Sequence, residues 1–371
     1  MLINDQVVFE VNDPDPIGGP EHTVVGLYGW DADTWWDNIR VYQLGVPLKA
    51  DLLETAERHL AQGNETTARD LFREVVDSAV DVARMERARK GLVTAKFNLE
   101  WRPHLAVTEA RLRRFWPKAR LKIADGGLSL DLSDGGVSHL EPIRDIPLSK
   151  LNCSRNEISS LEPLRGMKLQ NLDCSGNRIR SLAPLQGMPL EKLMCTENEI
   201  ESLEPVRGSP LELLDCPENH IESLEPLRGS HLKKLQCQAN RIRSLEFLRN
   251  LPLTVLSCDY NEIEDLAPLR GLSLTEFTCA HNRITNLEPV RHHPLDHLRC
   301  NSNLLTGLGS FVEKPPLLFY FENPTIPISE LERARSFWAG HERTAALARK
   351  AEILIAARNP QSVPLKKWPA A

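Results

Sequence analysis

Apolar positions recur with a fixed period of 21 residues through the middle of the chain. From Leu148 to Lys168 they follow the pattern LxxLxCxxNxIxxLxPLxGxx, and this pattern returns, with some departures, without a single insertion. Leu151 and Cys153 alternate with polar residues, which is typical of a short strand with one buried side. The unit has three later apolar positions, which are expected to fill the interior of one turn of the chain. They are Ile158, Leu161 and Leu164. Such a strict period predicts a repeat solenoid.

Stacking of the units explains the polar asparagine that follows each strand. One turn alone cannot bury its apolar side, whereas neighbouring turns form a continuous core and pair their strands into a parallel sheet. We predict that the asparagine amides form a ladder that satisfies backbone groups where the chain leaves the strand. The asparagines of this column are Asn156, Asn177, Asn198, Asn219, Asn240, Asn261, Asn282 and Asn303.

The repeated motif strongly resembles that of the leucine-rich repeat family, whose consensus begins LxxLxLxxN. Its PLxGx half resembles the short bacterial type, and the resemblance covers residues 127–325. It implies an α/β solenoid with a parallel β-sheet on the concave face and irregular segments on the convex face. Leu132 lies 21 residues before Cys153, and Phe321 lies 21 residues after Cys300. These two residues mark a first unit and a closing half-unit.

All eight cysteines occupy one column of the repeat. They are Cys153, Cys174, Cys195, Cys216, Cys237, Cys258, Cys279 and Cys300. No two are closer than 21 residues, so the sequence has no paired half-site for zinc. Parallel strands lie about 4.8 Å apart, whereas a disulfide requires Cβ atoms about 3.5–4.5 Å apart. We therefore expect reduced, buried thiols that act as small hydrophobic side chains, and hence a cytoplasmic protein.

The segments outside the repeat complete the predicted fold class. It is a solenoid with an α+β N-terminal segment and a helical C-terminal cap, which covers the core that a bare end repeat would expose. The predicted parts are an acidic and aromatic short-strand segment (1–45), a helical segment with the N-terminal cap (46–126), the solenoid (127–325) and a C-terminal helical cap with a tail (326–371). Within the first part, residues 7–11 and 22–28 have the composition of strands.

The tail from residue 328 to 357 has helical periodicity. Ser329 with Glu332 indicates a capping box at the start of this helix, and Gly340 indicates a break. The residues expected on one buried helical face are Leu331, Ala334, Phe337 and Trp338.

Composition and charge narrow the classes of function. The chain has 371 residues, a net charge of −6 and a mean hydropathy of −0.32. It contains no run of about 18 apolar residues, so we expect no transmembrane helix, and its first residues lack the pattern of a secretory signal. The net acidity argues against a globally basic nucleic-acid-binding protein.

We find no catalytic motif in the sequence. The glycine pairs at 126–127 and 135–136 are not followed by GK[ST], and a cysteine nucleophile has no candidate outside the ladder. Four histidines and one aspartate lie near the last full unit: His281, His292, His293, Asp296 and His297. They span a turn and the start of a strand, which disfavours a metal site. We therefore predict a protein that is not an enzyme and has no cofactor or resident metal.

Functional variation is expected at the exposed strand positions, because the leucine and cysteine positions are buried. These are the third, fifth, seventh and eighth residues of each unit, which vary while the framework repeats. They form an acidic patch in the fourth and fifth units and a mixed aromatic and polar strip further along. The candidate partner-binding residues are Met194, Glu197, Asp215, Glu218, Tyr260, His281, His297 and Arg299. We predict a scaffold or adaptor that binds a protein partner through the concave face.

Two alternatives remain open. In one, the terminal segments carry an effector or enzymatic activity and the solenoid is a targeting arm, because five of the seven tryptophans lie between residues 30 and 116. In the other, the basic segment 111–122 contacts nucleic acid, because six Lys or Arg residues are interleaved there with Phe115 and Trp116.

Acidic and basic residues three apart recur on the convex half of the repeat. The pairs are Glu162–Arg165, Glu204–Arg207, Glu225–Arg228, Glu246–Arg249 and Glu288–Arg291. We interpret them as solvated ion pairs worth about 0–1 kcal/mol each, which favour solubility rather than binding.

Overall fold

The computed structural model describes residues 2–3, 6–7, 51–78, 81–124, 126–340 and 342–358. The chain forms two units, Met1–Ala50 and Asp51–Ala371. In the first unit, β1 (Leu2–Ile3) pairs antiparallel with β2 (Gln6–Val7). Apart from Val7, the strands predicted at 7–11 and 22–28 lie outside the described residues.

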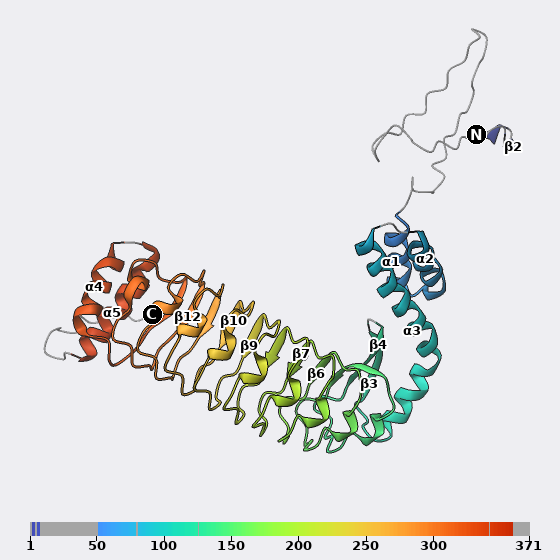
Figure 1. Ribbon diagram of the computed structural model, residues 1–371, viewed down its shortest axis with the longest axis horizontal. Coiled ribbons are helices and arrows are strands. Elements are labelled where there is room, and N and C mark those ends of the chain that lie inside the picture. Colours follow the sequence, from blue (N-terminus) through green and yellow to red (C-terminus); the bar gives the residue numbers. More distant parts are fainter. Residues whose placement is uncertain are drawn as a thin grey trace, which may run out of the picture. The chain divides into compact units, whose positions relative to one another are not determined.

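An eleven-stranded sheet extends through the repeat region, and its strands follow one another in sequence order from β3 to β13 (Figure 1). β3 pairs antiparallel with β4, and all later neighbours are parallel. From β5 onward each residue pairs with the residue 21 positions ahead, as Leu256 does with Phe277. The strands are β3 (Arg120–Ala124), β4 (Gly127–Asp131), β5 (Leu148–Asn152), β6 (Asn171–Asp173), β7 (Lys192–Met194), β8 (Leu213–Asp215), β9 (Lys234–Gln236), β10 (Val255–Ser257), β11 (Glu276–Thr278), β12 (His297–Arg299) and β13 (Leu318–Tyr320). The predicted solenoid is confirmed.

A short 3-10 helix follows in each unit, where the sequence predicted an irregular convex segment. In most units its second residue is proline, which has a fixed φ and no N–H group to leave unpaired. The helices are η1 (Glu141–Ile143), η2 (Glu162–Leu164), η3 (Ala183–Leu185), η4 (Glu204–Val206), η5 (Glu225–Leu227), η6 (Glu246–Leu248), η7 (Ala267–Leu269), η8 (Glu288–Val290) and η9 (Gly309–Val312).

The turn after the 3-10 helix explains the glycine of the motif. Arg165 has φ −54° and ψ 126°, and Gly166 has φ +81°, which together form a type II turn. In the first unit Asp145 stands at the glycine position, and Arg144 before it has φ −46° and ψ −40°. The chain there turns through a right-handed conformation instead. The residue at this position therefore selects the type of turn.

The inside of the stacked units is one continuous apolar core. The eight cysteine side chains have no exposed surface, so the predicted burial of the thiols is confirmed. Burial raises the pKa of every one of these thiols, because the apolar surroundings disfavour a thiolate. The thiols are therefore packed as neutral hydrophobic groups.

Asparagine amides link each unit to its neighbour, as predicted. The Ile200 N–H donates to Asn219 Oδ1 at 2.9 Å. Asn219 Nδ2 donates to the carbonyls of Cys195, Cys216 and Pro217 at 2.9, 3.2 and 3.0 Å. The same set of bonds recurs from the second unit to the ninth. One side chain thus satisfies backbone groups on two successive turns of the solenoid.

Three helices precede the sheet: α1 (Leu52–Ala61), α2 (Glu65–Ser78) and α3 (Val82–Arg113). They have an apolar core of their own, in which Phe72 is fully buried. Gly91 of α3 lies against this ring, because a Cβ added there would be 2.3 Å from a ring carbon. The other end of α3 enters the core of the solenoid through Leu112, and the buried Trp116 follows it. This end of α3 and β3 therefore cap the first unit.

Helices α4 (Ile328–Ala339) and α5 (Ala345–Arg358), joined by η10 (Glu342–Thr344), cover the last units (Figure 1). The buried residues of α4 are Leu331, Ala334 and Trp338. The Trp338 Nε1–H donates to the Val312 carbonyl at 2.8 Å. Gly340 ends α4, as predicted. The helical C-terminal cap is therefore confirmed.

Two details of the C-terminal cap differ from the prediction. Phe337 is 41% exposed, because the buried face of α4 is narrow and includes only every third or fourth residue. The expected capping box is also wrong: α4 begins at Ile328 after Pro327, and no side chain caps it. Ser329 already lies in the first turn of the helix, where it cannot act as the N-cap.

Candidate partner-binding face

One side of the sheet faces away from the core. We call it the open face and define it by the third, fifth, seventh and eighth positions of the units. At the third and fifth positions the side chains are exposed or half-buried, except for Ser257, which is buried. The seventh position departs from the prediction, because Ser154, Asp259 and Ala280 are buried there. Ser154 and Ala280 have small side chains, and the Asp259 carboxylate accepts a hydrogen bond from the Ala280 N–H, so these side chains do not extend into solvent.

The eighth position turns the chain out of the strand in a left-handed conformation. Its φ angles lie between +50° and +64° in the second to ninth units, at Arg155, Gly176, Glu197, Glu218, Ala239, Tyr260, His281 and Ser302. A left-handed conformation costs a residue other than glycine about 1–2 kcal/mol, so the surrounding structure must hold it. Glu197, Glu218 and Tyr260 are exposed at this column and His281 is half-buried. Half of the predicted site residues therefore stand on a fixed turn at the carboxyl-terminal edge of the sheet.

Aromatic side chains gather on the seventh to ninth units. The rings of Tyr260 and His281 are stacked, with centroids 4.1 Å apart and an interplanar angle of 9°. The ring of His297 meets that of Tyr320 edge-on at 5.9 Å. Tyr260 is 52% exposed, which is high for a ring of its size. The predicted aromatic and polar strip thus contains two separate ring pairs, Tyr260 with His281 and His297 with Tyr320.

Leu318 and Tyr320 on β13 extend this strip, and sequence reasoning missed them. They are 53% and 41% exposed. Lys350 of α5 lies 4.7 Å from the centre of the Tyr320 ring and pairs with Glu322 at 2.6 Å. The signal was present in the repeat period, because Tyr320 stands 21 residues after Arg299 in the fifth column. The half-unit that was expected to close the core therefore also contributes exposed side chains to the open face.

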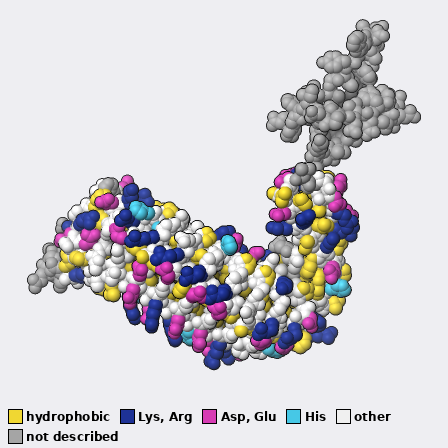
Figure 2. All heavy atoms as spheres, in the orientation of Figure 1, with side chains coloured by type: hydrophobic (Ala, Val, Ile, Leu, Met, Phe, Trp, Pro, Cys, Tyr) yellow, Lys and Arg dark blue, Asp and Glu magenta, His cyan; other side chains and the backbone are white. Residues whose placement is uncertain are grey.

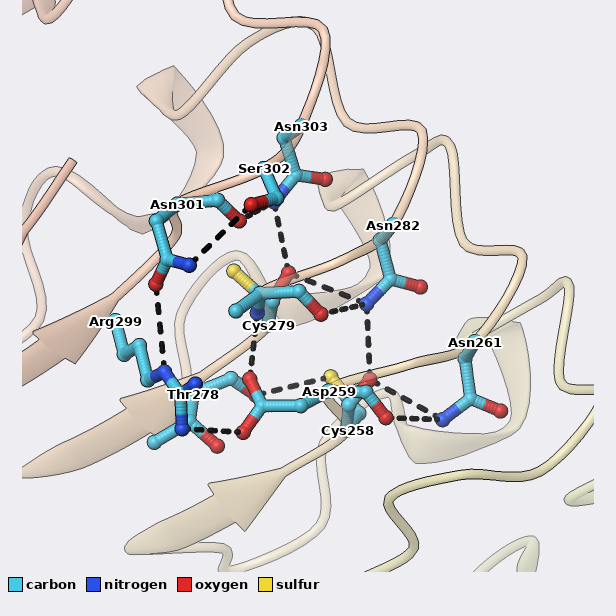
Figure 3. A network of polar contacts seen from close by, with 11 residues as sticks. Cys258, Asp259, Asn261, Thr278, Cys279, Asn282, Arg299, Asn301, Ser302 and Asn303 are labelled. Atoms are coloured by element: carbon cyan, nitrogen blue, oxygen red, sulfur yellow. Dashed lines mark hydrogen bonds and ion pairs between the residues drawn. The ribbon is translucent and has the colours of Figure 1, made fainter. Parts of the chain in front are cut away.

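Asp259 and Arg299 form a polar network on the same units, shown in Figure 3. Asp259 is 6% exposed and accepts a hydrogen bond from the Ala280 N–H at 2.5 Å. Its other carboxylate oxygen lies 3.7 Å from Arg299 Nη1. Arg299 Nε also donates to Asn301 Oδ1 at 3.3 Å. A buried carboxylate therefore holds one of the predicted partner-binding residues in place.

The acidic group of predicted residues lies on the fourth and fifth units. Met194 and Asp215 are half-buried on β7 and β8, and Asp215 accepts a hydrogen bond from Thr196 Oγ1 at 3.2 Å. Burial raises the pKa of the Asp215 carboxyl. The sixth unit separates this group from the aromatic strip. The structure therefore divides the eight predicted residues into two groups of four: Met194, Glu197, Asp215 and Glu218 in one, Tyr260, His281, His297 and Arg299 in the other.

The histidines near the last full unit do not converge. His293 is buried in the turn before β12, whereas His297 lies on β12 against Tyr320. His292 Nε2 accepts a hydrogen bond from Arg291 Nε at 2.8 Å. Within the described ranges, no three His, Cys, Asp or Glu side chains are grouped so that they could hold a metal ion.

Ion pairs cover the convex half, where Figure 2 shows Lys and Arg alternating with Asp and Glu in rows across the units. Four of the five predicted pairs are present: Glu162–Arg165, Glu204–Arg207, Glu246–Arg249 and Glu288–Arg291. The fifth prediction is wrong, because Glu225 pairs with Arg207 of the preceding unit. Arg228 instead lies 5.0 Å from the centre of the Phe247 ring. Phe247 takes the place of the usual proline and offers the guanidinium an aromatic face.

Part of the basic segment 111–122 is engaged within the fold. Arg113 donates to the Ala119 carbonyl at 3.1 Å and pairs with Glu109 at 2.9 Å. Lys118 Nζ donates to the Asp134 carbonyl at 2.8 Å. Trp116 is buried in the cap, so its ring is not available to stack on a base. Three side chains that could have contacted nucleic acid are thus engaged or buried within the fold. Nucleic-acid binding by this segment stays a prediction.

No protein-family model and no curated protein matches the chain. Among solved structures, an internalin C2 from Listeria monocytogenes str. 4b F2365 is 28% identical over 47% of this chain and 80% of its own, with a TM-score of 0.45. The functional domain of InlJ from Listeria monocytogenes, described as including a cysteine ladder, is 24% identical over 53% of each chain, with a TM-score of 0.38. The APL1 leucine-rich repeat domain is 20% identical over 52% of this chain and 55% of its own, with a TM-score of 0.43.

The internal geometry of this chain identifies its architecture. Its strands are parallel in a 21-residue register, its asparagines link successive units, and its convex segments are 3-10 helices. The chain has a leucine-rich repeat fold. No helix in the described part of the chain has the length and apolarity needed to cross a lipid bilayer.

Proposed function

We propose that the chain is a non-catalytic scaffold that binds a protein partner through the open face. The supporting observation is the contrast between a constant buried framework and a varied face that exposes Tyr260, Leu318 and Tyr320. Exposed Tyr and Arg side chains are favoured anchors in protein interfaces. The asparagine ladder and the paired strands fix the backbone beneath them, so binding orders few additional groups.

The proposal includes a reducing, cytoplasmic location. Its support is the cysteine column, in which eight thiols serve as hydrophobic side chains and none lies at the surface. Reducing compartments keep such thiols free.

The experiment is affinity capture with quantitative mass spectrometry, using variants that keep the backbone conformation. Glu197→Asn, Glu218→Asn and Tyr260→Asn together remove three exposed side chains from the eighth column. Asparagine tolerates the left-handed conformation better than most residues, so this triple variant is expected to fold. Arg299 is left intact, because its removal would leave the buried Asp259 without its ion pair.

A convex variant is the matched control. Glu162→Gln, Arg165→Gln and Glu246→Gln change the same number of exposed charged or polar side chains on the other half of the repeat. The open-face variant loses interface anchors, so we expect it to capture at least about tenfold less partner protein than the wild type. The convex variant should capture nearly the same amount as the wild type. Equal recovery of the same partners by the open-face variant, with unchanged circular dichroism, would overturn the proposal.

A further inference from the structure

The Asp259–Arg299 ion pair spans a whole repeat unit. Asp259 follows β10 in the seventh unit and Arg299 lies on β12 in the ninth, so the pair crosses the eighth unit. Ala280 lies between them in the seventh column, is buried, and has only a methyl group. Its N–H also donates to the Asp259 carboxylate. A small residue at this position leaves room for the arginine to reach across the eighth unit.

The guanidinium of Arg299 is held from the core side and keeps unused donors. An arginine has five N–H donors, and two of its nitrogens are engaged by Asn301 and Asp259. The Asp259 side chain is 8% exposed, whereas that of Arg299 is 40% exposed. The buried carboxylate therefore fixes the guanidinium while much of the arginine stays open to solvent.

Two neighbouring groups also have hydrogen-bonding capacity left over. Thr278 pairs with Arg299 across β11 and β12, and His297 lies two residues before Arg299 on the same strand. Within the part of the chain that the structure describes, Thr278 Oγ1 and His297 Nε2 are buried and have no hydrogen-bond partner. An unsatisfied buried polar group costs about 1–3 kcal/mol, so a side-chain rotation that brings either group to an acceptor from a ligand would relieve a cost already present.

We propose that these residues, which we call the Arg299 anchor (Asp259, Thr278, His297 and Arg299), bind the carboxylate of an Asp or Glu in an extended segment of the protein partner. The inference rests on the proposed function of the open face. Arg299 contacts the carboxylate directly, and Asp259 is a positioning residue. An apolar side chain next to the acidic residue packs on Leu318 and Tyr320, which are exposed beside the anchor.

Charge favours a carboxylate over a phosphate. Asp259 already offsets the charge of Arg299, and Glu276 lies exposed opposite His297 on the neighbouring strand. A ligand group with a single negative charge suits this nearly neutral site, whereas a doubly charged phosphate would meet both carboxylates. A phosphopeptide preference is therefore an outcome that would contradict the proposal.

The experiment begins with selection of random 12-residue peptides displayed on phage against the full-length chain. The counter-target is the double variant Asp259→Asn/Arg299→Gln, which removes both charges but keeps side chains of similar shape. The Glu246→Gln variant, changed at an exposed carboxylate of the convex half, is the control. We expect enrichment of peptides with Asp or Glu beside an apolar residue on the wild type and on Glu246→Gln, and its loss on the double variant.

The role of Asp259 is tested with one selected peptide and its Glu→Gln or Asp→Asn analogue, each fluorescein-labelled and measured by anisotropy. The wild type should prefer the acidic peptide by about tenfold or more, as for a charge-assisted hydrogen bond. Asp259→Asn makes the site more positive, so charge alone would tighten binding. A positioning role predicts the opposite, a preference reduced to less than about threefold.

Three results would overturn the carboxylate assignment: no acidic enrichment, equal enrichment on the double variant, or selection of basic or phosphorylated peptides. For the last, a phosphoserine form of the selected peptide is compared with the glutamate form by anisotropy. If one of these results appears while the triple asparagine variant still loses its captured partners, the Arg299 anchor is wrong and the scaffold function stands. If the triple variant also keeps its partners, the proposed function itself fails.

Discussion

Replacing Asn219 with alanine tests how much the asparagine ladder contributes to the stability of the solenoid. The side chain makes four hydrogen bonds to backbone groups of two units. Three of its partners keep another donor: the Cys195 carbonyl from Asn198, the Cys216 carbonyl from Asn240, and the Pro217 carbonyl from the Glu197 N–H.

The substitution would therefore leave the Ile200 N–H without a hydrogen-bond acceptor. Its hydrogen bond to Asn219 Oδ1 is buried. A buried donor without an acceptor lowers the free energy of unfolding by about 1–3 kcal/mol. The loss of the three hydrogen bonds from Asn219 Nδ2, together with the loss of packing by the amide group, lowers it by about 1 kcal/mol more. We expect Asn219→Ala to lower the free energy of unfolding by about 2–4 kcal/mol.

Urea unfolding followed by far-ultraviolet circular dichroism measures this loss. The midpoint should fall while the slope with denaturant stays unchanged. Asn171→Ala is the matched control, because Asn171 lies half-exposed at the third position of the open face, and it should change stability by less than about 0.5 kcal/mol. An effect of Asn219→Ala no larger than that of Asn171→Ala would refute the stabilising role of the ladder.

Three further changes test other parts of the fold. Gly208→Ala should cost about 1–2 kcal/mol from backbone conformation alone, because φ is +74° and an added Cβ meets nothing within 4 Å; a neutral effect in urea unfolding would contradict the type II turn. Gly91→Ala should cost about 1–3 kcal/mol, because its Cβ would overlap the Phe72 ring; an unchanged melting temperature would contradict the close packing of α2 and α3. Burial raises the pKa of Cys237 from 9.0 to about 12, so between these pH values the thiol ionises only in the unfolded chain. The thiols should therefore leave the free energy of unfolding unchanged below pH 9 and lower it as the pH rises from 9 toward 12. Cys237→Ala should flatten this decline measured by urea titration at several pH values, and an identical slope would argue against a buried neutral thiol.

The repeated framework could be predicted from the sequence because each position meets the same surroundings eight times. A buried column such as that of Cys216 and Asn219 is fixed by the period alone, and the turn glycines follow the same logic. The first half of the chain lacks this redundancy. The sequence predicts helices in this part, but the basic composition after residue 110 does not reveal that α3 continues to Arg113 without a break.

The polar contacts of the open face could be predicted only in part. Their columns follow from the period, which would also have placed Tyr320 beside Arg299. The Asp259–Arg299 pair joins side chains two units apart and depends on the small size of Ala280, which no pattern of hydrophobic and polar positions records. Arg228 likewise leaves its expected partner because one neighbouring unit has Phe247 in place of proline. Departures from the consensus therefore decide side-chain contacts that the consensus cannot specify.

Hydroxyl-radical footprinting of the chain with and without a captured partner tests the central claim, partner binding through the open face, most directly. Oxidation of exposed side chains is read by mass spectrometry. If the partner binds this face, Tyr260 and Tyr320 become protected, while Phe115 and Phe337, which are exposed elsewhere, react as before. Protection of Phe115 or Phe337 with unchanged oxidation of Tyr260 and Tyr320 would contradict binding through the open face.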